Sequence, residues 1–176
     1  MSAVSEPEQG ARGAQDADAD ARAVAPRGQG VARIVEVGDK EVTQREALAE
    51  CVVTMTTAAC SQLVAGTPKG NPVEAARIAG IMGVKRTPDL LPFCHPVAVT
   101  GAEIVVEPDP ATGRIVVRAT VRARDRTGVE MEALTAAAIA ALSLYDTAKA
   151  FDRSARIDGL RLLEKRGGKS GDYVAG

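Results

Sequence analysis

Alternating hydrophobic and polar positions predict strands in several parts of the chain. Residues 97–107 and 113–124 are alternating or β-branched runs on either side of a segment rich in Pro, Asp and Gly, so we expect them to form a hairpin. Shorter runs predict strands at 33–37 and 157–163. Residues 45–55 fit either a helix or a strand, although their β-branched second half favours a strand.

Three segments have patterns typical of helices. Residues 57–64 predict a short helix, and residues 130–151, dense in Ala and Leu, predict the longest one. Another helix should begin at Asn71, because a capping residue, a proline and an acid follow in the order of a helix start. It should end near residues 85–86, because Pro88 disfavours helical geometry in the residue before it. This helix carries three large apolar side chains on one face, namely Ile78, Ile81 and Met82.

The order of these elements predicts the fold class. Strands and helices are interspersed without a regular βαβ rhythm, which favours an α+β fold with helices on one face of a mostly antiparallel sheet. Residues 1–30 contain no Leu, Ile or aromatic residue and cannot bury enough apolar area to offset the entropy of ordering them. We therefore predict a disordered leader at 1–30 and a folded domain at 31–176.

Composition and charge limit the possible partners. The 22 Lys and Arg residues nearly balance the 23 Asp and Glu residues, so no strong overall field attracts nucleic acid. With only two Phe and two Tyr, the core must be aliphatic. The chain has no apolar run of membrane-spanning length and no signal pattern. We therefore expect a cytoplasmic protein with no membrane partner and no nucleic-acid partner.

The cysteines and the only histidine do not form a recognisable metal motif. The three cysteines are an odd number, at spacings that match neither a disulfide framework nor a zinc site: Cys51, Cys60 and Cys94. A metal site at Cys94-His95 would need carboxylate ligands, so we predict none.

The glycine-rich segment at 167–171 partly resembles a phosphate-binding P-loop. It lacks the first glycine of that motif, and too few residues follow it to form the required helix. Its glycines still permit close backbone approach to an anion, with Lys165 and Lys169 supplying positive charge.

Several charged residues allow both a structural and a chemical interpretation. Asp146 and Lys149 share a helix face, either as an exposed ion pair or as a pair for proton transfer. Glu130 and Glu132 are acids of the kind that stabilise the first turn of a helix. If the chain were extended there, both side chains would lie on the same face and could bind one ligand together. Lys69 precedes a capped helix, where it is either a solvated loop residue or part of a phosphate site.

Three long strings decide between these interpretations. They are KGNPVEAARIAGIMGVKRTPDLLPFCHPV (69–97), GVEMEALTAAAIAALSLYDTAKAFD (128–152) and KRGGKSGDY (165–173). Together they resemble the cyclic pyranopterin monophosphate synthase family, the accessory protein C of molybdenum cofactor biosynthesis. The resemblance spans about residues 33–174.

The resemblance implies a fold, an assembly and a reaction. It implies a ferredoxin-like α+β subunit in a homohexamer, a trimer of dimers, with the active site at a dimer interface. The family's substrate is 3′,8-cyclo-7,8-dihydroguanosine triphosphate, and its products are cyclic pyranopterin monophosphate and pyrophosphate. No cofactor is certain, and Mg²⁺ is a candidate companion of the triphosphate. The resemblance leaves open which subunit supplies Lys69.

Roles follow from the resemblance by motif position. The catalytic residues would be Asp146, Lys149 and Lys69. The substrate would be bound by Arg45, Cys94, His95, Glu130, Met131, Glu132, Lys165 and Lys169. Asn71 stands where the family usually has Asp, so it keeps the helix cap but receives no catalytic role.

Two other functions remain as alternatives. The first is a non-catalytic nucleotide-binding paralogue of the same fold, which would bind the substrate without turning it over. The second is a small RNA-binding module, but the predicted hairpin has no aromatic residue on which a base could stack.

Overall fold

The computed structural model describes residues 32–176, so the leader predicted at 1–30 lies outside the described residues and remains a prediction. Residues 36–176 form one compact unit. Its elements, in chain order, are β1 (Thr43–Thr54), α1 (Thr57–Ala65), α2 (Pro72–Leu90), β2 (Val99–Asp109), β3 (Arg114–Asp125), α3 (Glu130–Ala148), β4 (Arg156–Arg166) and β5 (Tyr173–Val174).

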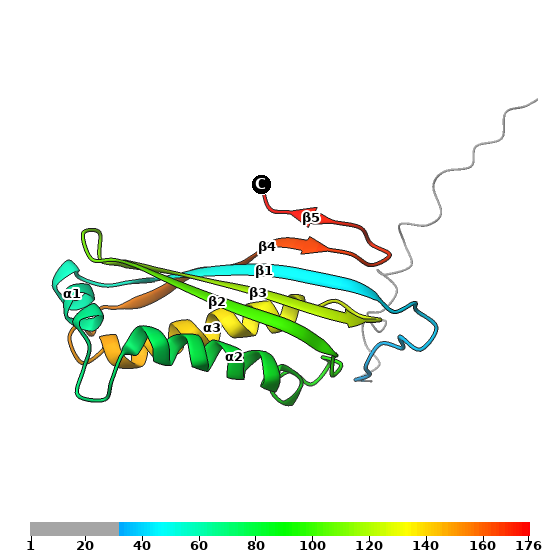
Figure 1. The fold of residues 1–176 in the computed structure, drawn as a ribbon, viewed down its shortest axis with the longest axis horizontal. Helices are drawn as coiled ribbons and strands as arrows, with labels where there is room; N and C mark the ends of the chain where they lie inside the picture. The colour runs from blue at the N-terminus through cyan, green and yellow to red at the C-terminus, as the bar shows by residue number, and fades with distance from the viewer. Residues whose placement is uncertain (1–31) are drawn as a thin grey trace, which may run out of the picture. The chain divides into compact units, whose positions relative to one another are not determined.

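The strands of this unit form one antiparallel sheet. Its five strands follow the order β2-β3-β1-β4-β5. Helices α2 and α3 lie side by side on one face of the sheet, with α3 against β1, β3 and β4 and α2 against β2 (Figure 1). The predicted α+β, ferredoxin-like class is therefore confirmed.

The core lies between this sheet face and the helices. Along β1 every second residue is buried, and small side chains occupy these positions: Ala47, Ala49, Cys51 and Val53. The same alternation runs along the neighbouring strand β3. Segment 45–55, which fitted a helix or a strand, is thus a strand in both halves and as far as Thr54.

Small residues allow α2 and α3 to pack closely. A side chain added at Gly80 would meet Ala136 O at 3.2 Å, and one added at Gly83 would meet the Ile139 side chain at 3.2 Å. The facing positions of α3 are mostly alanines. Close packing fixes the position of α3 along the sheet, which matters because both ends of α3 carry candidate site residues.

Several predicted boundaries need correction. The hairpin at 97–124 and the helices at 57–64 and 130–151 are confirmed within a few residues. The strand predicted at 33–37 is wrong, because residues 32–37 have no regular secondary structure. The strand predicted at 157–163 is longer at both ends, and the short strand β5 was not predicted.

Helix α2 departs from prediction in two ways. It continues through Pro88 to Leu90 instead of ending near 85–86. Thr87 is fully buried and its hydroxyl donates to Gly83 O at 2.9 Å, so the tertiary environment of this turn outweighs the local effect of proline. The face that carries Ile78, Ile81 and Met82 is exposed, and the buried face carries smaller residues.

Candidate active site

The last turn of α3 and the residue that caps it carry a carboxylate and an amine. Lys149 Nζ lies 2.6 Å from Asp146 Oδ1, and both side chains are more than half exposed. The hydrogen bond and the positive charge of Lys149 lower the pKa of the Asp146 carboxyl, and the same partner raises the pKa of Lys149. In the single chain both groups are therefore charged at neutral pH.

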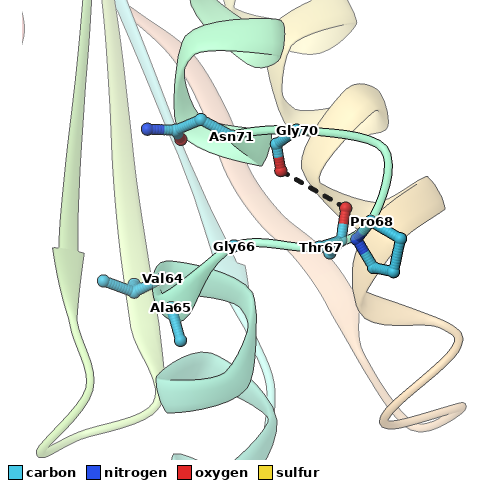
Figure 2. A pocket seen from close by; sticks show the side chains of 7 residues that line it. All are labelled: Val64, Ala65, Gly66, Thr67, Pro68, Gly70 and Asn71. Atoms are coloured by element: carbon cyan, nitrogen blue, oxygen red, sulfur yellow. Dashed lines mark hydrogen bonds between the residues drawn. The ribbon is translucent and has the colours of Figure 1, made fainter.

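Lys69 belongs to this same end of the molecule. It lies in the loop between α1 and α2, where Thr67 and Gly70 close a tight turn through reciprocal backbone hydrogen bonds. The Thr67 hydroxyl also donates to Gly70 O (Figure 2). The loop and the adjoining helix ends line a hollow of about 500 Å³. The positive charge of Lys69 is the smallest of the causes that act on the pKa of Asp146 and lowers it, so Lys69 lies near the Asp146–Lys149 pair within one chain. We call Lys69, Asp146 and Lys149 the acid–base group.

The other end of α3 carries the buried Glu132. This side chain is 1% exposed, and its Oε1 atom lies 3.5 Å from Cys94 Sγ. Burial raises the pKa of the Glu132 carboxyl, while the contact with Cys94 acts in the opposite direction. Burial and the nearby Glu132 carboxylate raise the pKa of the Cys94 thiol to about 11.

Glu130 and Glu132 do not act as a parallel pair. Helix α3 begins at Glu130, so residues two apart point to different faces, and the extended arrangement considered from the sequence is wrong. Glu130 lies 3.6 Å from Lys165 Nζ, whereas Glu132 turns into the protein. Met131 between them is exposed.

The cationic residues gather beside this end of α3. Lys165 Nζ lies 2.5 Å from Ser170 Oγ in the glycine-rich loop. Gly168 in that loop has a φ of +88°, and a side chain there would collide with the Arg45 guanidinium. Glycine is therefore needed both for the turn and for the close approach of Arg45. Lys169 is exposed on the same loop.

Asp125, at the end of β3, is a residue that the sequence interpretation missed. Its carboxylate accepts hydrogen bonds from the backbone N–H groups of Ala98 and Arg126, both at 2.7 Å, and these bonds lower the pKa of Asp125. Arg45 donates to the backbone carbonyls of Asp125 and Arg126 at 3.3 Å. Asp125 thus ties the segment that carries Cys94 and His95 to the strand end beside Arg45. The one sequence feature that could have indicated this linking role is the position of Asp125 at the end of the alternating run that forms β3.

The predicted site residues therefore form two groups within one chain. The second, which we call the binding group, comprises Arg45, Cys94, His95, Glu130, Met131, Glu132, Lys165 and Lys169. Fourteen residues of helix separate Glu132 from Asp146, which is about 21 Å at a rise of about 1.5 Å per residue. No side chain spans that distance, so the two groups cannot meet at one point within a single chain.

The described part of the chain has neither a membrane-spanning helix nor a metal-binding cluster. Among residues 32–176, no helix is long and apolar enough to cross a membrane. Within the same range, no three His, Cys, Asp or Glu side chains gather as a metal-binding group.

Comparison with known proteins gives the family. The model of the MoaC family matches residues 34–168, which is more than half of the chain. The chain belongs to the MoaC family. The matched range includes all of the predicted site residues except Lys169, which lies one position beyond it.

Curated relatives of this MoaC family member match more than four fifths of the chain. One from Chloroflexus aggregans and one from Parvibaculum lavamentivorans are each 51% identical, over 82% and 84% of this chain and 88% and 92% of their own. One from a Nostoc species is 49% identical over 83% of this chain and 88% of its own. All three are named cyclic pyranopterin monophosphate synthase.

Proposed function

We propose that this MoaC family member is a cyclic pyranopterin monophosphate synthase of molybdenum cofactor biosynthesis. It would convert 3′,8-cyclo-7,8-dihydroguanosine triphosphate to cyclic pyranopterin monophosphate and release pyrophosphate. The observation that carries the proposal is the identity of about half of all aligned positions to synthases over more than four fifths of the chain. We place the reaction in the cytoplasm, because its substrate derives from GTP.

The geometry supports an active site shared between two chains. Groups that hold the substrate ring and groups that transfer its protons must all lie within hydrogen-bond reach of the same ring. The binding group and the acid–base group lie about 21 Å apart along α3. In a dimer with a two-fold axis, the acid–base group of one chain would meet the binding group of its partner, and three such dimers would form the homohexamer.

Each group would supply a distinct part of the chemistry. The cations Arg45, Lys165 and Lys169 would bind the triphosphate, which carries any Mg²⁺ as part of the substrate. Glu130, Met131 and Glu132, with His95, would hold the guanine-derived ring, whose N–H groups suit carboxylate acceptors.

The acid–base group would move the protons. Opening the purine ring, rebuilding the pterin and closing the cyclic phosphate all require proton transfer. In the single chain the Asp146–Lys149 contact holds both groups in their charged forms. Binding of the substrate at the shared site would replace this contact, which frees the carboxylate to accept a proton and the ammonium to donate one.

Turnover by a folded protein tests the proposal directly. The full chain should convert the cyclised GTP derivative to the cyclic phosphate with one pyrophosphate released per turnover. Asp146→Asn and Lys149→Ala should each lower the rate by ~10²-fold or more and keep substrate affinity within about tenfold, as expected when a positioned proton-transfer group is removed. Near-normal turnover in these variants would show that the pair is only an exposed ion pair. Tight substrate binding by the unaltered chain without pyrophosphate release would identify a non-catalytic paralogue.

A further inference from the structure

The buried carboxyl of Glu132 is only half satisfied. Oε1 meets the Cys94 thiol, whereas Oε2 has no hydrogen-bond partner among the described residues. A buried carboxylate oxygen without a donor is unfavourable, so this oxygen calls for a partner beyond the described side chains, such as a water, an ion or a ligand group.

Cys94 reaches Glu132 from the segment between α2 and β2. Its Sγ atom lies 3.5 Å from Glu132 Oε1 and 3.8 Å from the neighbouring carbonyl of His95. The Glu132 oxygen is the closer of the two acceptors, so the thiol proton is directed to it. A pKa of about 11 keeps this thiol protonated, and therefore a donor, at neutral pH.

We propose that Cys94 is a positioning residue, which donates its thiol proton to Glu132 Oε1 and so presents Oε2 as the single oxygen for the substrate's ring. This inference rests on the proposed synthase function. It assigns Cys94 a role through Glu132 in place of direct contact with the substrate.

The charges around Glu132 give the proposal a pH signature. Glu130, on the same helical turn, and burial both favour the neutral form of Glu132, and Lys165 lies against Glu130. The thiol contact opposes them by stabilising the carboxylate. Loss of the thiol donor should therefore raise the pKa of Glu132 and move the acidic limb of the rate profile to higher pH.

Two substitutions at Cys94 separate hydrogen bonding from packing. Cys94→Ser keeps a donor but loses volume, whereas Cys94→Val fills the space with a somewhat larger apolar side chain and loses the donor. We expect the serine variant to retain near-normal kcat/KM, and the valine variant to lose ~10-fold or more, as for loss of a hydrogen bond to a charged group. The acidic limb should move only in the valine variant. The reverse order of activities would show a packing role and overturn the proposal.

A double variant tests whether Cys94 acts through Glu132. In a Glu132→Ala background, Cys94→Val should cause no further loss, since its target is already gone. Additive losses would show that Cys94 acts on the substrate by another route. The control is Cys51→Ala, because the Cys51 thiol lies in the buried core, away from Glu132, and donates to a backbone carbonyl, Ala137 O at 3.4 Å. This control should lower the melting temperature without moving the acidic limb.

A spectroscopic readout keeps the inference distinct from the proposed function. The Raman S–H band of Cys94 can be assigned as the component that Cys94→Ser removes. Glu132→Gln should shift this band to higher frequency, because a neutral amide oxygen is a weaker acceptor than a carboxylate. An unchanged band would overturn the inference even if the enzyme is active. A shifted band in a protein that never forms product would instead overturn the proposed function.

Discussion

Mixed assemblies test the shared site quantitatively. Arg45→Ala disables the binding group, and Asp146→Asn disables the acid–base group at the far end of α3. Neither variant should be active alone. After subunit exchange at equal amounts, about half of the dimers are mixed, and each mixed dimer holds one site with both lesions and one intact site, so about a quarter of wild-type activity should return.

The assay is pyrophosphate release, with exchange verified by native mass spectrometry of subunits that differ in mass. The matched control mixes Lys69→Ala with Asp146→Asn. In our proposal Lys69 and Asp146 of one chain serve the same site, so every site in that mixture keeps a lesion and no activity should return. Verified exchange without recovery in the first mixture would refute the shared site. Recovery in the control would show that Lys69 serves the site of the partner chain.

Three further predictions follow from individual residues. Gly168→Ala should weaken substrate binding more than it lowers kcat, because a side chain there displaces the Arg45 guanidinium and the φ of +88° is strained; KM and kcat separate these effects. Hydrogen bonds from the Ser154 hydroxyl and from backbone N–H groups, including that of Thr56, lower the pKa of Asp152 to about 2. The ionised Asp152 therefore stabilises the fold above its ordinary pKa of 3.8, and this stabilisation is lost as the pH falls toward 2. The melting-temperature difference between wild type and Asp152→Asn should thus shrink over that window, and a constant difference would contradict the assignment. Asn71→Ala should destabilise the fold by about 1 kcal/mol in urea unfolding, because it removes the helix-cap hydrogen bonds that Asn71 accepts from Val73 N and Glu74 N. Asn71→Asp should keep both the stability and kcat. A drop in kcat for Asn71→Asp would contradict a purely structural role of this residue.

Local signals in the sequence predicted the elements that depend on few neighbours. The hairpin followed from alternation around a turn-forming segment, and the start of α2 followed from the Asn71 cap, whose side chain accepts from Val73 N at 2.9 Å. The Asp146–Lys149 contact followed from spacing alone, since residues three apart share a helix face. Each of these depends on chemistry within a few residues.

Other features depended on contacts between distant segments, and there the sequence interpretation was incomplete or wrong. Segment 45–55 became a strand because β3 and β4 pair with it on both sides. Helix α2 ran past the expected stop because the turn at Thr87 is buried. Its large apolar residues were exposed because the close contact with α3 admits only small residues such as Gly80 and Gly83.

For the candidate site, motifs in the sequence identified the candidate residues and the two helical ends that carry most of them. How these residues group depends on the packed fold. It brought Lys69 toward Asp146 across a gap of 77 positions in the chain, and it directed the Cys94 thiol to a buried Glu132. It also separated the two groups by the length of α3. The physical reason is that spacing along a helix sets relative position within that helix, whereas burial and contacts between distant segments arise only when the sheet and helices pack together.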